Sequence, residues 1–175
     1  MYFSNFPIIP YDSVGSYEFK DVTNILKRVA IRSKVKTNTM LFDTYNVREG
    51  ETPESIADKL YDDSQLHWVI MLVNDITDRY HDWPLNGAQF NQFVDEKYSN
   101  PDGIHHYEIS QDSGDTSIVI DIGTDNTDYP TATPITNREY EESEQDRKRK
   151  IRLLDPRYLD NFVEEFTTLI KQEIF

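Results

Sequence analysis

The chain has 175 residues, a length typical of one domain or of one small domain with extensions. It carries 18 Lys and Arg against 32 Asp and Glu, and the resulting net charge of −14 disfavours nucleic acid as a partner. Cysteine is absent, which excludes thiol catalysis, disulfides and thiolate metal sites. The sequence contains neither a basic, apolar export signal nor a run of about 18 apolar residues. We therefore expect a soluble protein that has no membrane partner.

The N-terminal part, residues 1–39, is expected to be an apolar arm followed by a short element. Apolar side chains alternate with Pro and Ser in the first 15 residues, a pattern that suits an extended chain better than a helix. Such an arm needs a surface to lie on. After Asp21, residues 22–31 have apolar side chains at helical spacing, which predicts a short helix or strand.

Residues 40–100 contain the strongest local signals. MLFDTYNV predicts a strand that ends in a turn at Gly50. Thr52 before Pro53 predicts a helix start, because the hydroxyl caps free amides and the proline suits the first helical position. Ser64 is expected to cap a second helix that ends near residue 74, and Asn86 a third. Trp68 lies at helical spacing with its apolar neighbours, so we expect it in the core.

The remaining residues predict a hairpin and a final helix. In residues 101–136, IHHYEIS and TSIVIDI read as two strands joined through Gly114, followed by a polar loop from about residue 123. In residues 137–175, the charged run EYEESEQDRKRK reads as a solvated helix face or a linker, and IRLL as a short strand. Asp155 and Pro156 predict the start of an amphipathic helix with a broad apolar stripe. We expect this helix to dock on a partner, with the alternative that it completes the core of its own domain.

The search for chemistry finds no catalytic constellation and no cofactor motif. His105 and His106 are neighbours in a predicted strand, so their side chains are expected on opposite faces and unable to chelate one metal ion together. The Asp-rich loops lack the spacing of a calcium site, and the abundant carboxylates do not by themselves define a glycosidase pair. We expect no enzyme activity, no cofactor and no metal site. Trp83, in a break between helices, fits a core position and a sugar-stacking position about equally well.

Residues 45–74 resemble the lysin motif, a small βααβ module best known for binding N-acetylglucosamine polymers. The resemblance rests on Tyr45-Asn46-Val47, the turn from Glu49 to Thr52, Ser55-Ile56-Ala57 and the closing Asn74. It departs from the motif after residue 74, where another helix replaces the second strand. In sugar-binding members the ligand lies between two loops, which correspond here to Gly50, Glu51, Thr52, Asn74, Asp75 and Ile76.

The wider order of segments resembles a baseplate wedge protein family of contractile-tailed bacteriophages that contains a lysin-motif-like domain. The most characteristic segment is LYDDSQLHWVIMLVND. The resemblance implies an α+β fold, in which a small lysin-like strand-helix-helix module is extended by a further helix, a β-hairpin and a C-terminal amphipathic helix. It implies a structural protein of the virion tail baseplate, present in the host cytoplasm during assembly.

The same resemblance implies that the chain joins neighbouring wedge proteins within a symmetric assembly. The residues expected to bind these partners are apolar and lie in the two terminal segments: Phe3, Phe6, Ile8, Tyr158, Phe162, Phe166 and Ile170. Two other classes stay open, a glycan-binding module and a wall-degrading enzyme. The first requires a complete second strand beside an open groove at Gly50, and the second requires an acid and a base in a cleft.

Overall fold

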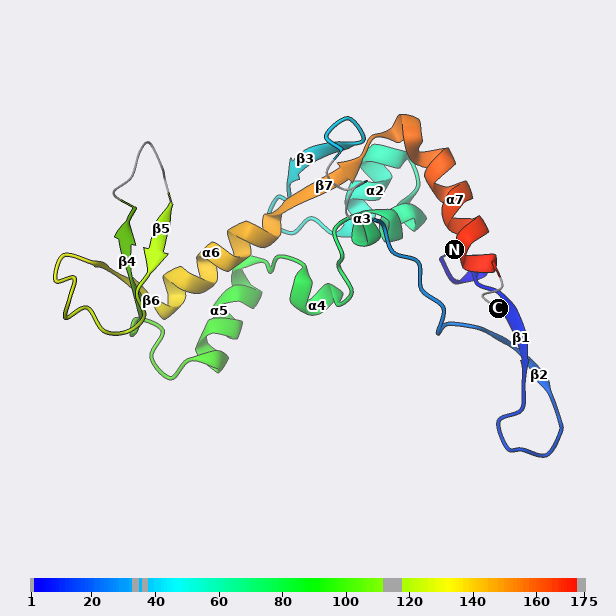
Figure 1. Ribbon diagram of the computed structural model, residues 1–175, viewed down its shortest axis with the longest axis horizontal. Helices are drawn as coiled ribbons and strands as arrows, with labels where there is room; N and C mark the ends of the chain where they lie inside the picture. The colour runs from blue at the N-terminus through cyan, green and yellow to red at the C-terminus, as the bar shows by residue number, and fades with distance from the viewer. Residues whose placement is uncertain (1, 33–34, 36–37, 112–117, 173–175) are drawn as a thin grey trace. The chain divides into compact units, whose positions relative to one another are not determined.

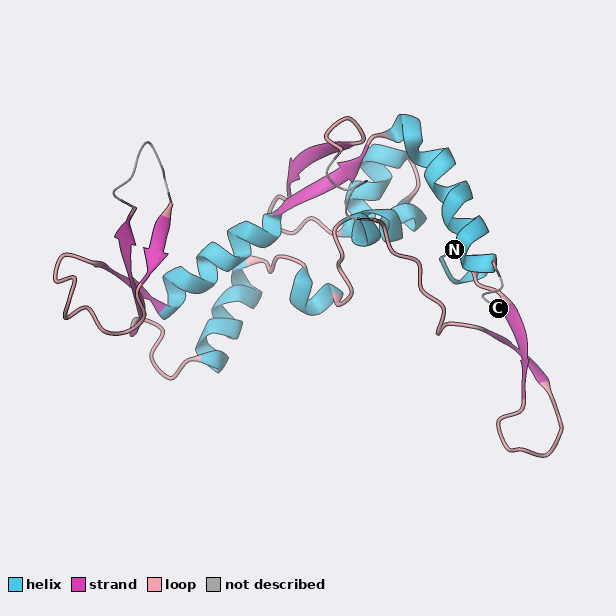
Figure 2. Cartoon of the chain, viewed as in Figure 1, coloured by secondary structure: helices cyan, strands magenta, loops and turns pink. Residues whose placement is uncertain are grey.

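The computed structural model describes residues 2–32, 35, 38–111 and 118–172. The fold is mixed α+β, with helices and three small sheets in these described residues (Figures 1 and 2). The chain forms two compact units. Unit 1 comprises residues 1–47, 51–82 and 151–175, and unit 2 comprises residues 48–50 and 83–150. No helix in the described ranges has both the length and the apolar character needed to cross a membrane.

The first helix of unit 1 begins at the predicted residue. α2 spans Pro53–Tyr61, and the Thr52 side chain accepts a hydrogen bond from the Ser55 amide at 3.2 Å. The Ser55 hydroxyl in turn accepts one from the Thr52 amide at 3.0 Å, which completes a reciprocal cap. The turn before the helix contains Gly50 at φ +76°, a conformation that glycine adopts without strain. This part of the sequence was predicted correctly from local signals.

The next helix starts differently from the prediction. η2, Ser64–Leu66, is a 3₁₀ turn, and α3 follows over His67–Val73. The cap is Asp63, whose carboxylate accepts a hydrogen bond from the Gln65 amide at 2.8 Å, so the assignment of the cap to Ser64 was wrong by one residue. Both side chains can cap a helix, and the sequence alone did not distinguish them. Asn74 ends α3, as predicted.

The small sheet of unit 1 joins segments that lie far apart in the sequence. β3, Phe42–Asn46, pairs with β7, Lys150–Leu154, and the two strands run in opposite directions in Figure 1. The predicted strand IRLL is therefore confirmed, and its partner is the strand that precedes α2. A second strand does complete this part of the fold, but it is supplied from 76 residues beyond Asn74 rather than directly after it.

The C-terminal helix packs against its own unit. η3, Pro156–Tyr158, leads into α7, Leu159–Lys171, and Asp155 caps the start as predicted. The Phe166 ring lies 4.4 Å from the ring of Trp68, centroid to centroid, and both side chains are buried. Ile170 is fully buried. Trp68 is thus a core residue, as predicted, and the buried stripe of α7 favours the alternative in which this helix completes the core of unit 1.

A buried tyrosine connects α2 to the end of β7. The Tyr61 hydroxyl donates a hydrogen bond to the Leu154 carbonyl at 3.0 Å. Burial raises the pKa of Tyr61 to about 12, because the phenolate would lose its hydration. The neutral hydroxyl is the form that fits the folded state.

This tyrosine is expected to give unit 1 an alkaline limit of stability. The pKa of Tyr61 is higher in the folded state than in the unfolded state, so its contribution is fully present below about pH 10 and is lost as the pH rises toward 12. Urea unfolding followed by circular dichroism should show the denaturation midpoint falling across this interval. Tyr61→Phe, which cannot ionise, should be less stable at neutral pH and should show a smaller fall. An equal fall in both proteins would contradict this assignment.

The N-terminal segment is an exposed hairpin. After η1, Tyr2–Asn5, strand β1, Ile8–Tyr11, pairs antiparallel with β2, Lys20–Thr23. The Asp12 carboxylate accepts hydrogen bonds from four backbone amides of the connecting loop, residues 14 to 17, at 2.7–3.3 Å. The helical alternative for residues 22–31 is wrong, because β2 ends at Thr23 and no helix follows up to residue 32. β-branched residues and Asn in this segment are poor helix formers.

Unit 2 contains two helices and a three-stranded antiparallel sheet. α4, Arg79–Asp82, is a single turn at the end of unit 1, and α5, Gly87–Lys97, is capped by Asn86 as predicted. β4, Ile104–Ser110, and β5, Val119–Asp121, form the predicted hairpin, and Gly114 lies outside the described residues. β6, Thr133–Thr136, pairs with the other edge of β4, so the predicted loop ends in a strand that sequence reasoning missed.

The charged run forms a helix that is partly buried. α6 spans Asn137–Arg149. Glu141 is almost fully buried, and its carboxylate accepts hydrogen bonds from Lys97 Nζ at 2.6 Å and from the Tyr98 hydroxyl at 2.7 Å. The hydrogen bond from Glu141 raises the pKa of Lys97. The interpretation of this run as a solvated face or linker therefore holds for the outer side of the helix only.

Candidate functional site

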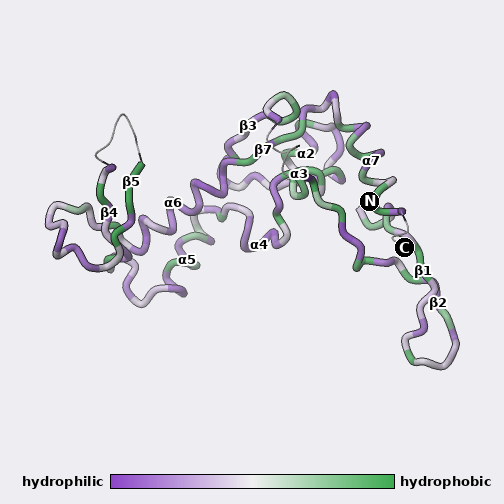
Figure 3. Tube along the Cα trace, viewed as in Figure 1, coloured by the Kyte–Doolittle hydropathy of each residue, from purple (hydrophilic) through white to green (hydrophobic). Residues whose placement is uncertain are grey.

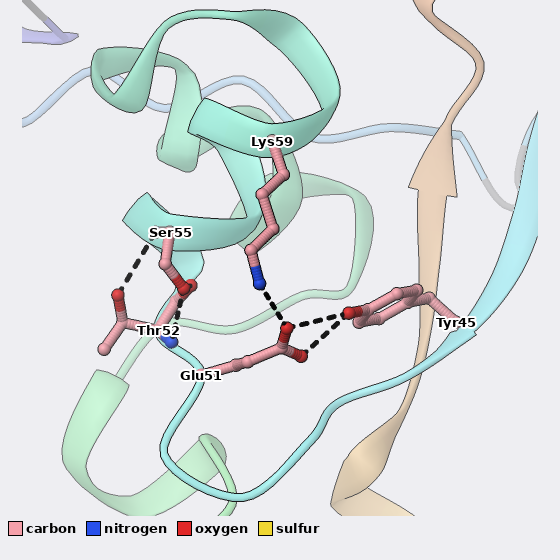
Figure 4. A network of polar contacts seen from close by, with 5 residues as sticks. All are labelled: Tyr45, Glu51, Thr52, Ser55 and Lys59. Carbon is pink, nitrogen blue, oxygen red and sulfur yellow. Dashed lines mark hydrogen bonds and ion pairs between the residues drawn. The ribbon is translucent and has the colours of Figure 1, made fainter.

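A polar network holds the turn before α2 (Figure 4). The Glu51 side chain is 9% exposed, and its carboxylate accepts hydrogen bonds from the Tyr45 hydroxyl at 2.8 Å and from Lys59 Nζ at 2.7 Å. A buried carboxylate needs such partners to offset its lost hydration. Glu51 and Thr52, two of the residues expected in a sugar groove, thus bind groups of the chain itself.

Asn74 connects the end of α3 to β7. Its side-chain Nδ2 donates hydrogen bonds to the carbonyls of Ile70 and Arg152, both at 2.8 Å. Its Oδ1 accepts one from the Arg152 amide, also at 2.8 Å. The side-chain amide therefore pairs with the backbone of β7 much as a neighbouring strand would. A role in holding the second strand explains why this residue ends the helix.

Asn74→Ala is expected to lower the free energy of unfolding of unit 1 by about 1–3 kcal/mol, because backbone groups of Arg152 and Ile70 each lose a partner. Chemical denaturation followed by circular dichroism measures this change. Asn91→Ala is a suitable comparison, since the Asn91 amide makes only an exposed contact with Arg138. Equal stability of the two variants would show that the Asn74 contacts carry no net stabilisation.

The other residues expected in the groove also have structural positions. Asp75 adopts φ +57° directly after α3, and the Ile76 amide donates a hydrogen bond to the Met71 carbonyl at 2.9 Å. These contacts turn the chain away from the helix. Each loop is thus organised by contacts that the chain makes with itself. These contacts leave the glycan-binding role without direct support.

The residues expected to bind partners fall into two groups. Phe6, Phe166 and Ile170 are buried in unit 1, and Phe162 is half-buried with its ring 6.3 Å from that of Trp68. In contrast, Phe3 is 61% exposed and Ile8 69% exposed, while Tyr158 is 37% exposed. The exposed members are the ones available to a partner in the folded chain.

The hairpin extends this exposed apolar surface well beyond the predicted residues. We call residues 2–26 the arm, and both of its strands are exposed along almost their whole length. β1 appears as a green, hydrophobic stretch of the trace in Figure 3. The signal in the sequence was the run of apolar residues without a helical or a one-faced strand pattern. Sequence reasoning missed these exposed residues of the arm: Tyr11, Val14, Tyr17, Phe19, Val22, Ile25 and Leu26.

The two adjacent histidines contradict the expectation of opposite faces. The Nδ1 atoms of His105 and His106 lie 2.9 Å apart. The register of β4 and β6 shifts between Ile104 and His106, which marks a β-bulge that breaks the alternation of side chains. His106 also contacts the Glu108 carboxylate at 3.2 Å, and the His105 ring stacks on Tyr140 at 3.9 Å. In the described ranges, no group of three or more His, Cys, Asp or Glu side chains could hold a metal ion.

An open groove in unit 2 is acidic but organised as structure. It has a volume of about 260 Å³, and Glu49, Glu142, Asp146 and Arg149 contribute to its lining. The Glu49 carboxylate accepts a hydrogen bond from the Gly87 amide at 3.1 Å, which supports the first turn of α5. Its position beside a helix start explains this carboxylate without catalysis.

Comparison with known proteins identifies the family. The model of the family described as base plate wedge protein 53 matches residues 1–129, most of the chain. The chain belongs to this family. Membership makes it a structural protein of the phage tail baseplate rather than an enzyme. The baseplate wedge protein gp53 of Enterobacteria phage T4 is 27% identical over 99 residues, which cover 57% of this chain and 45% of the relative. The chain thus aligns with about half the length of that relative.

The family match covers the arm, the turn before α2 and the strands β4 and β5. The segments β6, α6, β7 and α7 lie beyond the matched residues. A strand and a helix that complete unit 1 therefore come from the part of this wedge protein that the family model does not reach.

Proposed function

We propose that this wedge protein joins neighbouring baseplate proteins, and that its arm is the main docking element. The observation that carries the proposal is the large exposed apolar surface of residues 2–26. Ile8, Phe19 and Leu26 are 69%, 63% and 88% exposed. Monomeric proteins in water rarely expose contiguous apolar surface of this kind, and such patches mark sites of association.

The architecture of the arm supports the same conclusion. A two-stranded hairpin is marginally stable by itself in water, and β1–β2 forms a sheet with no third strand among the described residues. Its loop is nevertheless ordered by the four hydrogen bonds to Asp12. An arm with a fixed shape loses less conformational entropy when it docks. Burial of its side chains on a partner would stabilise the hairpin and the complex together.

The test is co-purification of the chain with other wedge proteins of the same phage. Ile8→Asp places a charge on the arm and should abolish co-purification. Tyr80→Asp is the matched control, because Tyr80 is 85% exposed but lies in α4, outside the arm. Retained binding by Ile8→Asp, with a circular dichroism spectrum like that of the parent, would contradict a docking role for the arm.

The fold of unit 1 is best described, within this proposal, as a lysin-motif-like scaffold. In support, β3, α2 and α3 follow one another in the order of that motif, and β7 takes the place of its second strand. The segment between α3 and β7 is then an insertion that carries unit 2. On this reading, the scaffold holds the arm and α7 in place rather than binding a ligand.

Glycan binding is the alternative function, and the second strand that it requires is present in β7. The contacts of Glu51, Thr52 and Asn74 weigh against it, because their polar atoms already bind other groups of the chain. We expect no heat of binding above background when a chitin oligomer is titrated into the protein. A micromolar affinity that is lost in Thr52→Ala, with the fold retained, would favour the glycan-binding class instead.

A further inference from the structure

The sheet of unit 2 has its apolar face uncovered. The pairs Ile109–Ile120 and Tyr107–Pro134 place these side chains on one face. Ile118 lies on the same face, two residues before Ile120 along the strand. Ile118 is 59% exposed and Ile120 45% exposed. Among the described residues of unit 2, no helix covers this face.

The opposite face of the same sheet is polar and faces α6. It carries His106 and Glu108, and the His106 ring lies 6.0 Å from that of Tyr140 on α6, centroid to centroid. Figure 3 shows the contrast, with α6 purple and hydrophobic residues in β5. The usual arrangement, in which a helix covers the apolar face of a sheet, is therefore reversed. We call the uncovered side the sheet face, and it is defined by Tyr107, Ile109, Ile118, Ile120 and Pro134.

Charge restricts what can cover the sheet face. Residues 101–136 contain seven acidic residues and no Lys or Arg. Two such faces in symmetric contact would bring like charges together, which is unfavourable at close range. The complementary surface must be apolar and basic.

The arm and the residues that follow it provide this chemistry. Residues 20–32 carry four basic residues and one acidic residue, in a chain whose net charge is −14. Exposed apolar side chains lie among them, and Leu26 at 88% exposure is next to the Lys27–Arg28 pair. We propose that residues 20–32 of one copy of this protein dock on the sheet face of a second copy.

The contact is head-to-tail, because it joins two different surfaces of the same chain. A heterologous contact of this kind builds a closed ring if the rotation between copies closes, and an open chain otherwise. The buried area is small beside that of a standard stable interface, so we expect a dissociation constant of roughly 1–100 μM for the free protein. The inference goes beyond the proposed function, since it requires only copies of this chain.

Sedimentation velocity of the purified full chain tests self-association first. The mean mass should rise between about 1 and about 100 μM protein, and it should fall when salt is raised from about 0.05 to about 0.5 M, because the charges are then screened. A protein that stays monomeric at about 100 μM in low salt overturns the proposal and leaves the sheet face to another baseplate protein.

Two variants assign the surfaces. Ile120→Asp should give a monomer, whereas Val119→Asp should associate like the parent, because Val119 is 50% exposed on the opposite face of the same strand. Leu26→Asp should also give a monomer. Circular dichroism confirms that each variant is folded. Association that survives Ile120→Asp or Leu26→Asp overturns the assignment of that surface.

Mixing the two monomeric variants separates head-to-tail contact from symmetric contact. Ile120→Asp keeps an intact arm, and Leu26→Asp keeps an intact sheet face. An equimolar mixture should therefore form dimers and nothing larger. A mixture that stays monomeric would show that the association of the parent is symmetric and would overturn the proposal.

Discussion

Trp68→Ala is expected to lower the free energy of unfolding by about 3–5 kcal/mol, the usual cost of removing a large aromatic side chain from a core. Trp68 is 7% exposed, and its ring lies 4.4 Å from Phe166 and 5.5 Å from Tyr2, centroid to centroid. The loss is a large share of the 5–15 kcal/mol that stabilises a typical domain. Urea denaturation followed by tyrosine fluorescence and circular dichroism measures it, and poor soluble expression is a further expected sign.

Tyr80→Ala is the matched control, since Tyr80 is an aromatic residue that is 85% exposed. It should change stability by less than about 0.5 kcal/mol. A Trp68→Ala variant that unfolds like the parent but fails to bind a partner would contradict the core assignment. Trp68 would then be a docking residue.

Removal of residues 155–175 is expected to unfold unit 1. The truncation deletes three buried apolar side chains of α7, those of Leu159, Phe166 and Ile170. Each contributes about 1.5–3 kcal/mol when buried, so the loss of about 5–9 kcal/mol is comparable to the stability of a whole domain. Circular dichroism and a thermal scan of the truncated chain measure the result. A truncated chain that keeps a cooperative transition and loses only its partners would restore the docking interpretation of this helix.

Two neighbouring residues of α7 refine the same prediction. Ile170 is fully buried and Leu169 is 38% exposed. Ile170→Ala should lower the free energy of unfolding by about 2–5 kcal/mol, and Leu169→Ala should lower it much less. If Leu169→Ala were the more damaging substitution, the buried face of α7 would be assigned incorrectly.

The helix starts were predictable because their signals are local. Thr52 before Pro53, Asn86, and Asp155 before Pro156 each mark a start that the structure contains. Each signal depends on a side chain and backbone amides only two or three residues away. The error at Ser64 has the same origin, since two adjacent residues offered equivalent caps.

Pairings between distant segments were not predictable in the same way. IRLL was recognised as a strand, but nothing within it indicates β3 as the partner, and the pairing is fixed by the packing of unit 1 as a whole. Likewise, the apolar stripe of α7 was visible in the sequence, while the choice between a partner and Trp68 depends on tertiary contacts. Burial of Phe166 and Ile170 supports the second of these.

The histidine pair shows how one irregular residue defeats a pattern. Alternation along β4 separates neighbours, and the bulge between Ile104 and His106 brings their rings together. A bulge has no reliable signal in a single sequence. The exposed arm was predicted more successfully, since its apolar residues were identified as a surface in need of a partner before its hairpin was known.

The most direct test of the arm as a docking element is a structure of the assembled baseplate at side-chain resolution. The decisive quantity is the solvent-exposed fraction of Ile8, Tyr11 and Phe19, which are 69%, 55% and 63% exposed in the free chain. Our account predicts that all three are buried against another protein chain in the baseplate. An arm that remains exposed to solvent there, while the chain is held by other surfaces, would contradict it.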